Sequence, residues 1–117
     1  MSELKRINVG KRLSDVVVHN KVAYFAGQVP NDTTLDAEGQ TADVLKTIDE
    51  LLAEVGSDKT RLLSVQIFLP NMSEFAGMNR AWDAWIPEGK TPARATIEAR
   101  LANPDYKVEI MLTAAVD

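Results

Sequence analysis

The sequence predicts an α/β or α+β layer, with one mixed sheet of six strands and two helices on the same face. Six segments show the alternating or continuous apolar pattern of strands, and two longer segments repeat apolar residues at helical spacing. Their order is three strands, a helix, a strand, a helix and two strands. Because strand-helix-strand crossovers are right-handed, the two crossovers in this order place both helices on one side of the sheet.

The composition indicates a single domain over residues 1–117. This length fits one domain, and 45% hydrophobic residues are ordinary for a globular chain with a real core. The net charge of −4 and the pI near 5.0 argue against a nucleic-acid binder, because contacts with the phosphate backbone need a basic surface. Small molecules or proteins are the expected partners.

Several classes of chemistry are excluded by what the sequence lacks. It has no cysteine, which excludes disulfides, thiolate metal sites and thiol nucleophiles. One histidine and no spaced acidic cluster provide no metal-ligand set, and there is no Gly-x-Ser-x-Gly motif of a nucleophilic hydrolase. The N-terminus has no apolar leader, and no run is long enough to span a membrane. We therefore expect a soluble cytoplasmic protein without a metal site.

The first three strands are expected at residues 4–9, 16–18 and 22–26. A turn joins the second to the third, and His19 is expected in it as an exposed polar residue. Gly27 then ends the third strand. A glycine here allows the backbone to approach a ligand or partner closely, and an ordinary bend explains it equally well.

The first helix is expected at residues 36–55. Asp36 is a suitable N-cap, Gly56 ends the helix as a C-cap, and a stripe of apolar residues between them is expected to face the core. The strand that follows is expected at residues 62–69, where its continuous apolar run predicts a central position and Pro70 stops it.

The second helix is expected from Asn71 through about Trp85. Asn71 followed by Glu74 fits a capping box, which would open the helix. Its apolar face is expected to pack on the sheet, with an aromatic cage as the minority alternative, and consists of Phe75, Met78, Trp82 and Trp85.

The segment around Arg94 is the strongest candidate for function. Alternation predicts a strand with one face of small and apolar residues toward the core: Ala95, Ile97, Ala99 and Leu101. The other face is expected to be free for chemistry or assembly and carries Arg94, Thr96, Glu98 and Arg100. Arg100, at the far end, is the rival of Arg94 as the functional cation.

The last strand is expected at residues 106–114. Its core-facing residues are Val108, Ile110, Leu112 and Ala114, which places Glu109 and Met111 on the opposite face. Glu109 and Arg94 together resemble an active-site pair, although such pairs are more often structural salt bridges. The face without helices would expose apolar residues, so we expect the chain to form oligomers through it.

These residues resemble the Rid (YjgF) family of reactive-intermediate deaminases over nearly the whole chain. The resemblance is carried by Ala26-Gly27-Gln28, Gln40-Thr41, Val44-Leu45, Ile48-Asp49, Phe75, Met78-Asn79, Pro92-Ala93-Arg94 and Glu109. It implies a chorismate-mutase-like fold, a homotrimer whose sheets pack into a central barrel, and three sites at the subunit interfaces. It also implies hydrolysis of enamines and imines of 2-oxo acids, such as 2-aminoacrylate, to the oxo acid and ammonia, without metal or organic cofactor.

The resemblance gives five residues a role. Arg94 matches the arginine that binds the substrate carboxylate, and Glu109 matches the carboxylate that positions water or moves a proton. Backbone groups near Gly27 would help to hold the substrate. Asn79 matches a motif asparagine, and Thr96 stands where many members have a pocket cysteine. A trimer that binds small 2-oxo carboxylates without turnover is the alternative function.

Three departures from the family pattern concern the pocket. Many members carry a tyrosine before the second strand, where this chain has Arg12-Leu13-Ser14. Thr96 replaces the cysteine, and residues 101–104 differ from the usual shorter leucine-proline turn. The carboxylate clamp is kept, so these departures bear on the shape of the pocket and hence on the substrate.

Overall fold

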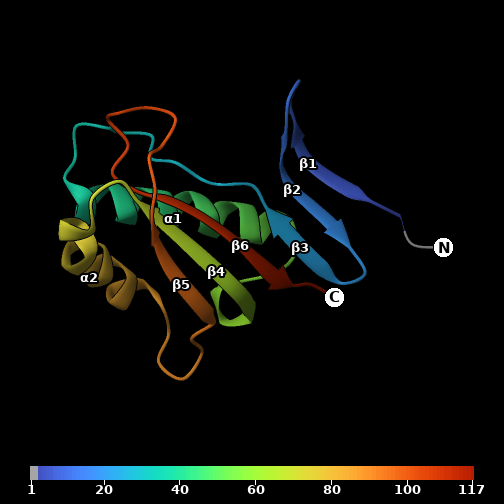
Figure 1. The fold of residues 1–117 in the computed structure, drawn as a ribbon. Helices are drawn as coiled ribbons and strands as arrows, with labels where there is room; N and C mark the ends of the chain where they lie inside the picture. The colour runs from blue at the N-terminus through green and yellow to red at the C-terminus, as the bar shows by residue number, and fades with distance from the viewer. Residues whose placement is uncertain (1–2) are drawn as a thin grey trace.

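The computed structural model describes residues 3–117 and confirms the predicted layer of one mixed sheet and two helices (Figure 1). The sheet order is β1-β2-β3-β6-β4-β5, and neighbouring strands are antiparallel except for the parallel pair β4 and β5. The last strand, β6, thus inserts between β3 and β4. The elements are β1 (Lys5–Val9), β2 (Ser14–His19), β3 (Val22–Phe25), α1 (Ala37–Glu54), β4 (Leu62–Leu69), α2 (Phe75–Trp85), β5 (Ala93–Glu98) and β6 (Glu109–Ala115).

The hairpin between β2 and β3 has a two-residue turn. Asn20 and Lys21 both adopt positive φ, at 51° and 65°, and His19 pairs with Val22 across the hairpin. Positive φ at both central residues matches the right-handed twist of the flanking strands, and asparagine tolerates this conformation well. His19 therefore closes β2 beside the turn and lies far along the sheet from β5.

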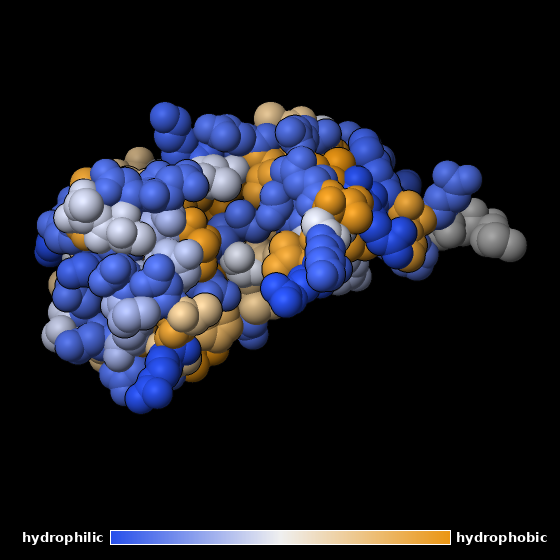
Figure 2. Space-filling view, turned by 90° about the horizontal axis from the view of Figure 1, so that it is seen from above, coloured by the Kyte–Doolittle hydropathy of each residue, from blue (hydrophilic) through white to orange (hydrophobic). Residues whose placement is uncertain are grey.

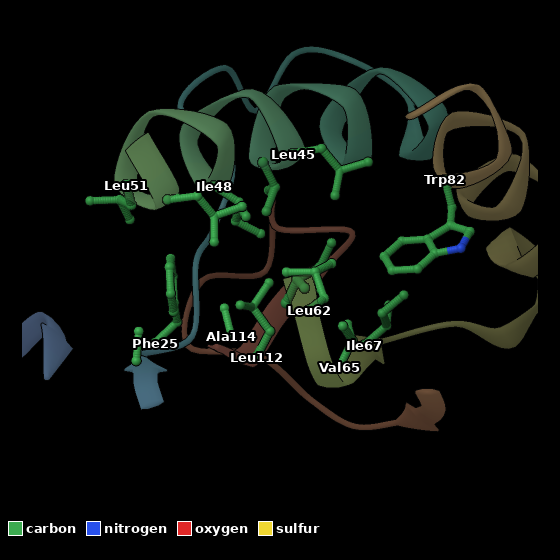
Figure 3. Close-up of a cluster of buried hydrophobic side chains, with 14 of the residues drawn as sticks. Phe25, Leu45, Ile48, Leu51, Leu62, Val65, Ile67, Trp82, Leu112 and Ala114 are labelled. Atoms are coloured by element: carbon green, nitrogen blue, oxygen red, sulfur yellow. The ribbon is translucent and has the colours of Figure 1, made fainter. Parts of the chain in front are cut away.

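Helix α1 begins and ends as expected. The side chain of Asp36 accepts a hydrogen bond from the Gly39 backbone N–H at 2.8 Å, and Gly56 adopts a φ of 75° just beyond the helix. Figure 3 shows Leu45 and Ile48 pointing from α1 toward the side chains of β4 and β6, with Trp82 of α2 reaching into the same core.

Two expectations for α2 are wrong. The Asn71 side chain accepts from the Ser73 N–H at 2.9 Å, which caps a short 3-10 helix (Met72–Glu74) in place of a capping box with Glu74. Phe75 is 41% exposed, whereas Met78 and Trp82 are buried. The reason is that α2 packs mainly on α1, while its Met78 and Trp82 join the hydrophobic core. Its buried face therefore includes small residues and is turned away from Phe75: Gly77, Met78, Ala81 and Trp82.

The strand β6 starts at Glu109, later than the predicted residue 106. Buried Gln40 of α1 is the cause, because it holds the preceding loop in a turn. Its side-chain oxygen accepts from the Lys107 N–H at 2.8 Å, and its Nε2 donates to the Asp105 carbonyl at 3.1 Å. These two hydrogen bonds fix the position at which the loop ends and Glu109 begins β6.

The two faces of β5 are the reverse of those predicted. Arg94 pairs with Val65 of β4, a core residue, so Arg94 and Thr96 lie on the helix side and are partly buried. Ala95 and Ile97 are exposed on the other face. Turning the alanines toward the core would bury little apolar area. On this edge strand, that gain is smaller than the gain from placing the longer side chains in contact with α2.

The face of the sheet opposite the helices is uncovered in this chain. It exposes large hydrophobic side chains on three strands: Tyr24, Ile97 and Met111. Seen from above, the molecule is hydrophilic over most of its surface, with hydrophobic residues reaching the surface in groups between the hydrophilic ones (Figure 2). Within residues 3–117, neither helix has the length and apolar character needed to cross a membrane.

Candidate functional site

The Arg94 side chain leaves β5 beneath α2 and is held there by two contacts. Its guanidinium carbon lies 5.2 Å from the centre of the Trp82 ring, and Nη1 lies 4.0 Å from the sulfur of Met78. Met78 and Trp82 are one helical turn apart and so face the strand together. The ring face attracts the cation, an interaction typically worth about 0.5–2 kcal/mol. Arg94 is therefore held on one side only, and its remaining N–H groups are available.

Within residues 3–117, no carboxylate pairs with Arg94. The ion pairs among the described residues join Arg61 to Asp117 and Arg80 to Glu38. Partial burial lowers the pKa of the Arg94 guanidinium, and the nearby negative charge of Asp83 raises it in part. A guanidinium that is partly desolvated and lacks an anionic partner favours an incoming anion.

A cleft of about 500 Å³ opens beside this guanidinium. It is lined by Asn79, Trp82, Asp83, Thr91, Pro92 and Arg94. Asn79 and Asp83 are four residues apart on α2 and form one wall, whereas Thr91 and Pro92 belong to the loop that leads into β5. One face of α2 and the start of β5 thus lie together around the Arg94 guanidinium.

Thr96 shares the helix side of β5 with Arg94. Its hydroxyl oxygen is buried and has no hydrogen-bond partner among residues 3–117. Leaving a buried hydroxyl unpaired typically costs about 1–3 kcal/mol. A polar group of a ligand or of another chain would satisfy it.

Glu109 and Gly27 form a second group on the uncovered face. Glu109 lies opposite Phe68 at the start of β6, and a short bridge between Gln28 and Ile110 holds Gly27 beside it. A Cβ atom on Gly27 would collide with the Glu109 Oε2 atom. The missing side chain lets the Glu109 carboxylate of the same chain approach the backbone. A close approach to a ligand or partner at Gly27 stays a prediction.

One chain does not bring these two groups together. Arg94, Asn79 and Thr96 lie on the helix side at the β5 edge, whereas Glu109 and Gly27 lie on the other face. The strand β4 runs between β5 and β6. Arg94 and Glu109 consequently form neither an active-site pair nor the structural salt bridge within one chain.

Sequence reasoning missed the side chains that hold Arg94. Trp82 and Met78 were expected mainly as core residues, with an aromatic cage as the minority alternative, and they also contact the guanidinium. Asp83 was not considered. The available signal was the spacing of Asn79, Trp82 and Asp83, which places all three on adjoining positions of α2.

A larger cleft of about 590 Å³ lies between α1 and α2. Its arginine, Arg80, donates from Nε to Glu38 at 2.7 Å, so this cation is already paired. Lys59 sits over the Trp85 ring at 5.5 Å. No group of three or more candidate ligands that could hold a metal ion occurs within the described residues. The Arg94 cleft is therefore the better candidate despite its smaller volume.

Comparisons with known proteins show which family and which solved structures the chain is similar to. A family model described as endoribonuclease L-PSP matches residues 3–116. A RutC family protein from Haemophilus ducreyi is 51% identical over 114 residues, covering 97% of both chains. The crystal structure of a YjgF family member from Neisseria meningitidis superposes with a TM-score of 0.95 at 44% identity, covering 98% of this chain and 96% of that one.

A more distant relative carries an activity in its name. The 3-aminoacrylate deaminase RutC from Acinetobacter baylyi is 29% identical over 103 residues, covering 83% of this chain and 81% of its own. The nearer relatives are named only by family. The match to the family model, the identity to the Haemophilus protein and the shared fold lead to one conclusion: the chain belongs to the YjgF/Rid family.

Proposed function

We propose that this protein is a hydrolytic deaminase of enamine and imine intermediates derived from amino acids, giving a 2-oxo acid and ammonia. The observation that carries the proposal is the Arg94 guanidinium, which has no carboxylate partner among residues 3–117 and lies at a cleft with room for a small acid. A planar guanidinium holds a carboxylate by two parallel hydrogen bonds, which also fixes the orientation of the adjoining C=N carbon. The deaminase activity named for the Acinetobacter relative supports the same reaction class.

The reaction adds water across the C=N bond and then expels the nitrogen. Arg94 would bind the carboxylate, with Asn79 and the Thr96 hydroxyl beside it, and Glu109 would orient the water or transfer its proton. Gly27 would keep the carboxylate of Glu109 close to backbone groups that hold the substrate nitrogen or carboxylate. This division of labour needs no metal and no cofactor.

The proposal requires a second copy of the chain, because one chain separates Arg94 from Glu109. We propose a homotrimer with the sites at its interfaces, in which Arg94 of one copy faces Glu109 of the next. The uncovered face with Tyr24, Ile97 and Met111 supports association, since a monomer would leave these side chains in water. The protein is proposed to act in the cytoplasm.

A trimer that binds 2-oxo carboxylates without turnover is the second candidate. Its support is that the Arg94 cleft of a single chain contains carboxylate-binding groups but not Glu109. The acidic net charge of −4 speaks against nucleic acid as a substrate.

A coupled assay separates the two candidates. 2-Aminoacrylate or 2-iminobutyrate is generated in situ, and its decay is compared with and without the protein, alongside sedimentation to determine the oligomer. We expect faster decay and a trimer. Binding of 2-oxobutyrate with no change in decay would favour the binding protein, and a stable monomer at micromolar concentration would contradict the interface site.

A further inference from the structure

The Arg94 cleft contains one cation and one anion that do not pair. Among its lining residues Arg94 is the cation and Asp83 the anion, and Arg94 forms no ion pair within the described chain. Asp83 is exposed at the cleft wall. The guanidinium attracts one carboxylate of a ligand, and the carboxylate on the wall repels a second one. The cleft can therefore distinguish ligands by the number of carboxylates they carry.

Helix geometry fixes where Asp83 stands relative to a bound acid. Asp83 lies one turn beyond Asn79 on α2, and both face the loop residues Thr91 and Pro92 across the cleft. An acid whose carboxylate sits on Arg94 must extend between these walls. A second carboxylate on that acid would enter the field of Asp83, whereas an uncharged tail or a protonated imine nitrogen would not be repelled.

We propose that Asp83 sets the charge selectivity of the cleft, so that it accepts 2-imino and 2-oxo monocarboxylates and rejects dicarboxylates. This inference rests on the proposed role of Arg94 and adds the substrate class. Asp83 is a specificity residue that touches no reacting atom. Its negative charge lowers the affinity for dicarboxylates by repelling their second carboxylate.

The test compares 2-oxobutyrate with 2-oxoglutarate by calorimetric titration of the wild type and of Asp83→Asn. The wild type should bind 2-oxobutyrate more tightly. Removing one charge from a partly solvated cleft should reduce the ratio of the two Kd values by about 3- to 10-fold. Most of the change should come from tighter binding of 2-oxoglutarate, and it should shrink in high salt because the charges are exposed.

Two further variants make the outcome decisive. Glu50→Gln removes an exposed carboxylate from α1, outside the cleft, and should leave the ratio unchanged. Arg94→Ala should weaken binding of both acids. If Asp83→Asn behaves like Glu50→Gln while Arg94→Ala loses binding, Asp83 has no selective role and the Arg94 site stands. If Arg94→Ala binds both acids as the wild type does, the site itself is misplaced and the inference falls with it.

Discussion

The strands β5 and β6 each carry one of the two principal residues of the proposed site, and they present them to opposite faces of the sheet. β6 is central, and its large aliphatic side chains Ile110 and Leu112 fill the core, so Glu109 must face away. β5 is an edge strand, and its Arg94 and Thr96 lie beneath α2 while Ile97 faces outward. Alternation defines two faces in both strands, but the neighbouring elements decide which face is covered.

The two groups of residues therefore suit different steps of the proposed reaction. The β5 group contains the free cation and suits binding, whereas the β6 group contains a carboxylate beside bare backbone and suits water or proton transfer. If this is correct, substitutions on β6 should lower turnover with little effect on binding, and substitutions on β5 should lower binding itself.

The largest effect is expected from Glu109→Gln. Loss of general acid-base assistance typically lowers the rate by about 10²- to 10⁴-fold. The Arg94 cleft does not include Glu109, so the affinity for 2-oxobutyrate should stay close to that of the wild type. The check is the in situ imine assay together with calorimetry. Full activity in this variant would make Glu109 a structural residue.

The next effect is expected from Arg94→Ala. A charge-assisted bidentate contact is worth roughly 1.5–3 kcal/mol, so binding of 2-oxobutyrate should weaken by about 10- to 150-fold. Arg94→Lys should restore little of it, because an ammonium group cannot hold the plane of the carboxylate.

Arg100→Ala is the matched control for this change. Arg100 is exposed and lies beyond the end of β5, outside the cleft. Its substitution should leave ligand-observed NMR titrations unchanged. Loss of binding in Arg100→Ala with retention in Arg94→Ala would move the site to the other end of the strand.

A smaller effect on turnover is expected from Gly27→Ala. The new methyl group would occupy the position of the Glu109 carboxylate, whose flexible end can swing aside. Thermal stability should therefore change little, whereas displacing the carboxylate by about 1 Å should lower turnover by roughly 10- to 100-fold. Gly27 has no positive φ, so backbone strain would not confuse the result. Unchanged turnover would show that Glu109 does not need its present position.

Much of the fold could be predicted because local signals and burial agreed. Asp36 capped α1, Gly56 ended it, the apolar run of β4 took a central position, and the aliphatic residues of β6 faced the core as alternation required. The faces of β5 could not be predicted, since alanine gives little preference for either side. The late start of β6 was hidden as well, because it depends on Gln40, which is distant in the sequence.

The candidate site was predictable as residue types but not as geometry. Arg94 and Glu109 stood out as charges on apolar strands, and the resemblance to the family added Gly27, Asn79 and Thr96. Their separation into two groups depends on strand order and on which face α2 covers. Both are properties of the assembled sheet, and no local pattern contains them.

The most direct test of a site shared between copies is complementation between two inactive variants. Arg94→Ala keeps Glu109, and Glu109→Gln keeps Arg94. The two proteins are mixed in equal amounts, dissociated and reassembled, and turnover is measured against each variant reassembled alone. In a ring of copies that associate at random, roughly a quarter of the interfaces should pair an intact Arg94 with an intact Glu109.

The mixture should regain about a quarter of wild-type turnover, since each working site draws its two residues from different copies. Reassembly of each variant alone should restore none. If the mixture forms mixed oligomers, shown by native mass spectrometry with one variant isotope-labelled, and still has no activity, Arg94 and Glu109 do not act across an interface. That result would contradict the division of the site between copies.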